Sequence, residues 1–160
     1  MKIINHRHTG LIVNNFDLML NFYKGMGLSL RRHDLEEGEF IDQLLGAQNI
    51  ILETAKLVIE DKNSIFGYSF QLELMKLKNK INLNSYPEKD FDIFQREMGV
   101  LDLAFTVDDI CGAQSFILEN GGGLIGLGPV QAKTGFPALH CYAYDPEGNI
   151  LHIVENLAPK

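Results

Sequence analysis

Four polar side chains that could hold a metal ion are spread along the sequence: His8, Glu73, Asp102 and His152. Each lies in a short segment with the composition of a β-strand, on the strand face opposite to the larger hydrophobic side chains. Two imidazoles and two carboxylates without a thiolate suit a divalent ion such as zinc, nickel, manganese or iron. A charged aspartate inside a strand is costly unless it is paired or binds a metal. The residue types favour a metal site, while their spacing leaves open whether the four converge.

The elements that must position these residues form an internal repeat. An offset of 94 places His8 on Asp102, Asn15 on Asp109 and Gly27 on Gly121, with hydrophobic positions agreeing in between. An offset of this length is too long for a solenoid and suits a duplicated half-domain. We therefore interpret the chain as two copies of one unit, with histidine at the first position of one copy and aspartate in the other.

Each copy is predicted to contain a strand, a helix and about three further strands. Residues 8–13 and 102–107 alternate in hydrophobicity as strands do. Asn15 and Asp109 are suitable N-cap residues, and the two repeated glycines stand where a helix end favours a left-handed conformation. The later strand-like segments are LSLRRH, IILETAKLVIED and YSFQLELMKL in the first copy, and GLIG, PALHCYAYD and NILHIVE in the second.

These elements divide the chain into modules that together form one domain. We expect a first module at 1–78, a linker at 79–98 and a second module at 99–160. The first module contains an insertion at 35–48 with a short helix, and a second short helix is possible around 91–98.

The composition excludes several classes of protein. The chain has 160 residues, is 46% hydrophobic and has a net charge of −7. It contains no basic cluster of more than two or three residues, which argues against nucleic acid or an anionic membrane as the main partner. No apolar run is long enough to span a bilayer, and no signal peptide is recognisable at the N-terminus. Two cysteines, Cys111 and Cys141, lack metal-type spacing, so we expect a reduced, cytoplasmic protein.

Four segments taken in order resemble the vicinal oxygen chelate superfamily, the group of glyoxalase I, methylmalonyl-CoA epimerase, extradiol dioxygenases and bleomycin-resistance proteins. They are HTGLIVNNFDLMLNFYKGMGL, QLELM, GVLDLAFTVDDI and DPEGNILHIVE. The resemblance implies an α+β fold in which two tandem βαβββ modules form an open, cup-shaped mixed sheet around a divalent ion. It also implies a homodimer and a small-molecule substrate.

The resemblance assigns the metal ligands to the first and last strands of each module, which are His8, Glu73, Asp102 and His152 here. Asp102 stands where metal-binding relatives usually have histidine, and His152 stands where they usually have glutamate. The two departures compensate each other, because the set still contains two imidazoles and two carboxylates. Glu155 does not replace the missing glutamate, because it lies three residues later and on the opposite strand face.

Several functions are compatible with this resemblance. The first is a metal-dependent lyase or isomerase that acts through an enediolate, with Glu73 as the general base. The second is iron(II) dioxygenase chemistry on His8, His152 and Asp102. The third is a metal-free binding protein like the drug-resistance members, in which the site is degenerate and Asp102 pairs with His152.

A few other polar residues are secondary candidates. His6 could be a second or alternative ligand, whereas His33 and His140 are expected on the surface or in a pocket wall. Three basic side chains could contact an anionic substrate: Arg31, Arg32 and Lys133. Solvated surface positions are the simpler interpretation of all three.

Overall fold

The computed structural model describes residues 7–45, 48–64, 67–79, 102–131 and 137–157. The chain forms two compact units, Met1–Arg96 and Glu97–Lys160, and each is described by itself. The linker expected at 79–98, apart from its first residue, and the possible helix at 91–98 lie outside the described residues. No helix in the described ranges is long and apolar enough to cross a bilayer.

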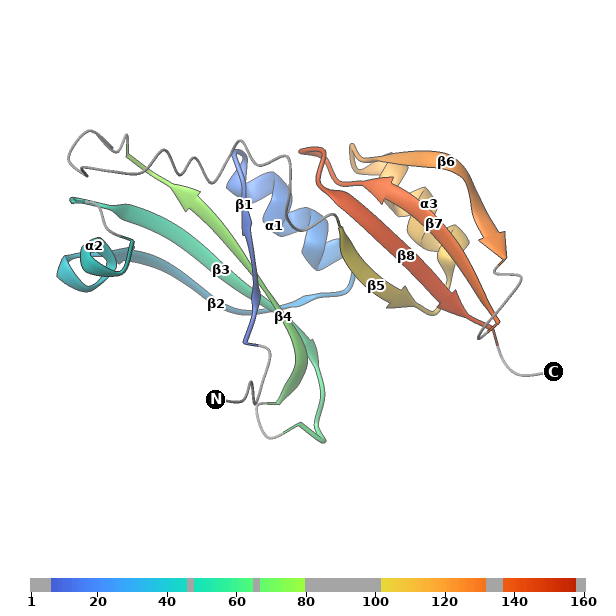
Figure 1. Ribbon diagram of the computed structural model, residues 1–160, viewed down its shortest axis with the longest axis horizontal. Coiled ribbons are helices and arrows are strands. Elements are labelled where there is room, and N and C mark those ends of the chain that lie inside the picture. Colours follow the sequence, from blue (N-terminus) through green and yellow to red (C-terminus); the bar gives the residue numbers. More distant parts are fainter. Residues whose placement is uncertain (1–6, 46–47, 65–66, 80–101, 132–136, 158–160) are drawn as a thin grey trace, which may run out of the picture. The chain divides into compact units, whose positions relative to one another are not determined.

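The first unit contains one mixed four-stranded sheet. Its elements are β1 (Thr9–Ile12), α1 (Phe16–Gly25), β2 (Ser29–Glu37), α2 (Glu39–Leu45), β3 (Ile51–Glu60) and β4 (Tyr68–Leu77). The strand order is β1-β4-β3-β2, with β1 parallel to β4 and the other neighbours antiparallel. Figure 1 shows α2 at the far end of the sheet, after β2.

The second unit repeats this topology. Its elements are β5 (Leu103–Val107), α3 (Ile110–Glu119), β6 (Gly123–Gln131), β7 (Ala138–Tyr144) and β8 (Ile150–Asn156). The strand order is β5-β8-β7-β6, with β5 parallel to β8 (Figure 1). The predicted α+β class, with the order βαβββ occurring twice, is therefore confirmed.

The helices begin and end at the predicted residues. The side chain of Asn15 accepts a hydrogen bond from the Leu18 N–H, and that of Asp109 accepts one from the Gly112 N–H. These bonds satisfy donors that the first helical turn leaves without a partner. After the helices, Gly27 and Gly121 have φ values of +102° and +88°, which a side chain with a Cβ rarely adopts.

Apolar side chains fill the space between each helix and its sheet. In the first unit, Leu72 and Leu74 of β4 are fully buried, as are Met19 and Tyr23 of α1. In the second unit the equivalent core residues are Leu151, Ile153 and Ile117. Each fully buried aliphatic side chain contributes about 1.5–3 kcal/mol by the hydrophobic effect. This burial fixes the strand faces, so the alternate residues are turned away from the helices.

Two strands are longer than their sequence pattern predicts. β2 continues through Glu37, which pairs with Ile51, so the first residues of the expected insertion belong to this strand. The rest of the insertion contains the predicted short helix, α2. β6 continues to Gln131 beyond the GLIG segment, with an irregular register opposite β7. Strand pairing extends both segments where local alternation is weak.

Candidate metal centre

Strand register gives Glu73 and His152 equivalent places in the two sheets. Gly10 of β1 is paired with Glu73 of β4, and Ala104 of β5 is paired with His152 of β8. Gly10 and Ala104 are related by the same offset of 94 that relates His8 to Asp102. His8 therefore lies two residues before the strand partner of Glu73, and Asp102 lies two residues before the strand partner of His152. All four positions belong to the strand face opposite to the buried core residues.

In the first unit, His8 and Glu73 lie side by side. His8 Nδ1 is 3.4 Å from Glu73 Oε2, and the exposed fractions of the two side chains are 38% and 8%. Two atoms bound at about 2.1 Å to one tetrahedral ion lie roughly 3.4 Å apart. The separation of the nitrogen and the oxygen therefore fits two ligands of one divalent ion.

Lys56 of β3 occupies the other oxygen of the same carboxylate. Its Nζ lies 3.5 Å from Glu73 Oε1 and 3.7 Å from Glu36 Oε1. Thr54, which is buried, donates a hydrogen bond of 3.1 Å to Glu36 Oε1. The lysine compensates the negative charge of the buried Glu73, and it leaves Oε2 directed toward His8.

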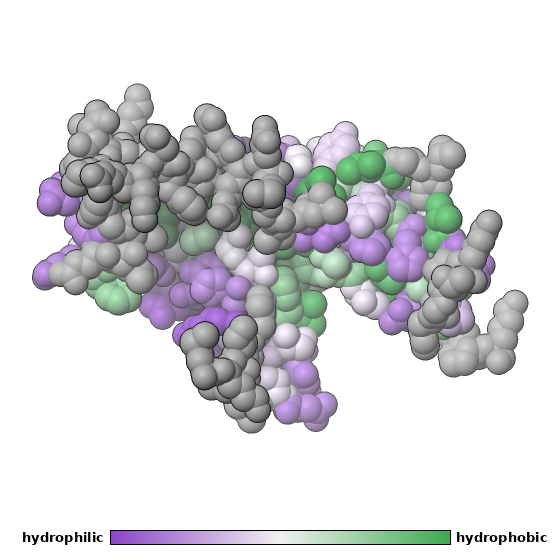
Figure 2. Space-filling view, in the orientation of Figure 1, coloured by the Kyte–Doolittle hydropathy of each residue, from purple (hydrophilic) through white to green (hydrophobic). Residues whose placement is uncertain are grey.

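Lys56 is not among the candidate residues that the sequence pattern indicates. The available signal was a lysine between Ala55 and Leu57 in a segment with strand composition. Its partner was not predictable, because Lys56 is opposite Glu73 only in the register that β3 and β4 adopt. Figure 2 shows hydrophilic residues gathered over β2 and β3.

In the second unit, His152 lies within a column of three rings. Its Nε2 is 3.1 Å from His140 Nδ1, and the two imidazole centroids are 5.3 Å apart. Tyr142 also stacks on His152, with its centroid 4.5 Å from that of His152 and an interplanar angle of 14°. Asp102 is partly buried just before β5, and no ion pair joins it to His152 in the described part of the chain.

No group of three or more histidine, cysteine, aspartate or glutamate side chains converges within either unit, among the residues that the structure describes. On the sheet faces opposite to the helices, the described contacts between such groups are two pairs, His8 with Glu73 and His140 with His152. The donors are imidazole nitrogens and carboxylate oxygens, the types that zinc, nickel and iron accept.

A buried turn fixes the hairpin of β7 and β8. Asp145 is fully buried, and its carboxylate accepts hydrogen bonds from the N–H groups of Glu147 and Asn149 at 3.0 and 2.9 Å. The side-chain amide of Asn149 also donates to both oxygens of Asp145. The DPEGN segment thus holds the ends of the two strands that carry His140 and His152.

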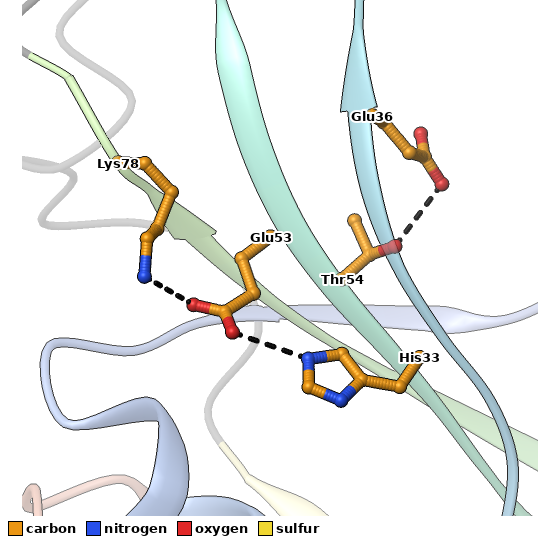
Figure 3. A network of polar contacts seen from close by, with 5 residues as sticks. All are labelled: His33, Glu36, Glu53, Thr54 and Lys78. Atoms are coloured by element: carbon orange, nitrogen blue, oxygen red, sulfur yellow. Dashed lines mark hydrogen bonds and ion pairs between the residues drawn. The ribbon is translucent and has the colours of Figure 1, made fainter.

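A second polar network lies on the helix side of the first sheet. Figure 3 shows Lys78 and His33 reaching Glu53 from two directions, at 2.9 and 3.1 Å. The hydrogen bond from Lys78 lowers the pKa of Glu53, and burial opposes this effect only in part. His33 also stacks on Phe16 of α1, with a centroid distance of 5.1 Å. These residues are separate from the face that carries Glu73.

The other secondary candidates have local partners or are outside the described residues. The Arg31 guanidinium lies 4.8 Å from the centroid of the Tyr68 ring, and Arg32 forms an ion pair with Asp34. His6 and Lys133 lie outside the described residues.

The fold can be compared with proteins of known structure. No protein-family model matches the sequence, and no curated protein matches it. A glyoxalase family protein from Bacillus cereus has a TM-score of 0.74 and 24% identity, over 99% of this chain and 97% of that chain. A glyoxalase I mutant from Zea mays has a TM-score of 0.56 and 18% identity, over 94% of this chain and 46% of that chain.

A third similar structure broadens the class. A glyoxalase/bleomycin resistance protein/dioxygenase family enzyme from Burkholderia phytofirmans has a TM-score of 0.51 and 15% identity, over 94% of this chain and 97% of that chain. The chain therefore has the same fold as these glyoxalase and glyoxalase/bleomycin resistance protein/dioxygenase family proteins.

Proposed function

We propose that this chain is a metal-dependent lyase or isomerase of the glyoxalase type, acting on a small substrate with vicinal oxygens. The proposed ligands of the divalent ion are His8, Glu73, Asp102 and His152. The observation that carries the proposal is the pairing of His8 with Glu73 at a separation that suits two ligands of one ion. The equivalent registers of Glu73 and His152 support the same role for the second pair.

The bound ion would supply Lewis acidity toward the two substrate oxygens and favour enediolate formation. Glu73 would act as the general base when the ion holds it loosely, because Lys56 pairs with Oε1 and leaves Oε2 to alternate between the ion and the substrate proton. The same lysine offsets the negative charge of the buried carboxylate. His8 beside it would orient the accepting oxygen.

Proton exchange tests this function. Metal content of the purified chain is measured by elemental analysis, and exchange alpha to the carbonyl of small α-hydroxyketones is followed by NMR in D₂O. We expect Glu73→Gln to reduce the exchange rate by about 100-fold, the usual range for a general base. Glu53→Gln, on the helix side of the same sheet, is the matched control and should retain the rate. Full exchange after verified metal removal would overturn the proposal.

The ion pair between Lys56 and Glu73 favours one second candidate. If Lys56 keeps Glu73 away from the metal, then His8, His152 and Asp102 remain as the two-histidine, one-carboxylate set used with iron(II) and oxygen. Anaerobic loading with iron(II), followed by an oxygen electrode with a catechol as substrate, distinguishes this candidate. Oxygen uptake without alpha-proton exchange would support it over the lyase or isomerase.

We also propose that the chain forms a homodimer, as the family resemblance implies. Sedimentation velocity over a range of protein concentrations measures the mass of the species in solution. A species of monomer mass at all concentrations would contradict this proposal.

A further inference from the structure

The imidazoles of His140 and His152 are adjacent on one face of the second sheet. β7 and β8 are antiparallel neighbours in which Tyr142 pairs with His152 and His140 pairs with Val154. His140 is therefore the diagonal neighbour of His152, and both side chains are on the face opposite to the buried Cys141 and Ile153. Long side chains at such diagonal positions can meet, and these two do.

The nearest nitrogens, His140 Nδ1 and His152 Nε2, lie 3.1 Å apart. Adjacent ligands of one ion, at bond lengths of about 2.1 Å, lie roughly 3.0 Å apart in octahedral and 3.4 Å apart in tetrahedral geometry. The pair of nitrogens therefore has the spacing that a metal chelate requires, although His140 was expected only on the surface or in a pocket wall.

We propose that His140 is a metal ligand, and that it forms with His152 a two-imidazole chelate for a borderline divalent ion such as zinc or nickel. This assignment rests on the proposed function and adds a ligand to its site. His140 adds an imidazole on the same face of the same sheet as His152. An added imidazole favours zinc, nickel or iron over magnesium or calcium.

The protons of the pair are compatible with chelation. In the neutral pair, one of the two facing nitrogens carries the proton of the hydrogen bond and the other accepts it. When an ion occupies both lone pairs, that proton moves to the other nitrogen of its own ring, so each imidazole stays neutral. Tyr142 stacks on His152 and fixes the plane of the ring, as a residue that orients a ligand does.

Metal titration of the complete chain tests the assignment. Metal-stripped protein is titrated with Zn²⁺ and, separately, Ni²⁺ in a calorimeter, and Co²⁺ absorption reports the ligand type independently of any activity. We expect His140→Ala and His152→Ala each to raise the Kd by at least about tenfold and to change the Co²⁺ spectrum. His33→Ala, which removes a partly exposed imidazole from the other face of the first sheet, is the matched control and should leave both readouts unchanged.

The outcomes separate this assignment from the proposed function. If His140→Ala binds Zn²⁺ and Ni²⁺ as tightly as the original chain while His152→Ala does not, His140 is not a ligand and the metal-dependent function survives. If the original chain binds neither Zn²⁺ nor Ni²⁺, this assignment fails, whereas the proposed function fails only if the chain also binds neither manganese nor iron. Should His140→Ala unfold, as judged by circular dichroism, His140→Gln replaces it, because glutamine keeps a polar side chain of similar size but a poorer metal donor.

Discussion

The ammonium of Lys56 lies 3.5 Å from one oxygen of Glu73, while the imidazole of His8 lies 3.4 Å from the other oxygen. A buried carboxylate at the proposed metal site thus has a cation of its own. A divalent ion that binds Glu73 must therefore bind the oxygen beside His8, while the Lys56 ammonium stays at the other oxygen and repels the ion. The lysine is therefore expected to weaken metal binding.

Replacing Lys56 with methionine should lower the Kd for Zn²⁺ or Ni²⁺ by about tenfold, because the lysine charge repels the ion. At about 5 Å and an effective dielectric constant of about 20, this repulsion amounts to a few kcal/mol before solvent screening reduces it. Calorimetric titration of metal-stripped protein measures this change. Lys78→Met is the control, since Lys78 pairs with Glu53 on the helix side of the sheet. An unchanged or higher Kd for Lys56→Met would show that the lysine does not compete with the ion.

The hydrogen bond from Lys78 to Glu53 should make stability depend on pH. Because the pKa of Glu53 is lowered below its usual value of 4.5 in the folded chain, its ionised form stabilises the fold above that pH. This contribution is lost as the pH falls through the folded pKa. We expect Glu53→Gln to reduce the free energy of unfolding by about 0.5–1 kcal/mol at pH 7. Urea unfolding at pH 7 and at about pH 3 should show the difference shrinking. A difference of equal size at both pH values contradicts the assignment.

The turn at Asp145 should be important for stability. Asp145→Ala removes the acceptor of several hydrogen bonds inside a buried turn, and we expect a loss of about 2–4 kcal/mol in the free energy of unfolding. Asp145→Asn keeps one acceptor oxygen and should lose less. Thermal unfolding of both variants makes the comparison. Equal stability of Asp145→Ala and the original chain would show that the turn forms without these bonds.

The two cysteines should differ in reactivity. Burial raises the pKa of the Cys141 thiol. Cys111 is exposed on α3. A chromogenic disulfide reagent should therefore label one thiol rapidly in the folded chain and the second only after denaturation. Cys111→Ser should remove the rapid phase, and a rapid phase that persists in this variant would mean that Cys141 is accessible.

Much of the fold was predictable from the sequence, because it depends on local patterns. Two-residue alternation identified the buried faces of β4 and β8, and the repeated Asn15 and Asp109 marked both helix starts. The repeat offset also aligned His8 with Asp102. The strand registers agree with this alignment, because Gly10 pairs with Glu73 and Ala104, 94 residues after Gly10, pairs with His152. Such features need only the period of a strand, the chemistry of a cap and the duplication itself.

The tertiary structure decided which polar residues meet. Lys56 reaches Glu73 because β3 pairs with β4 in one register, and a shift of one residue would turn the lysine to the other face. His140 reaches His152 because β7 and β8 form an antiparallel pair whose diagonal neighbours lie close together. Neither contact can be read from the local sequence, because each joins residues of two different strands. The register that brings them together exists only once the sheet has formed.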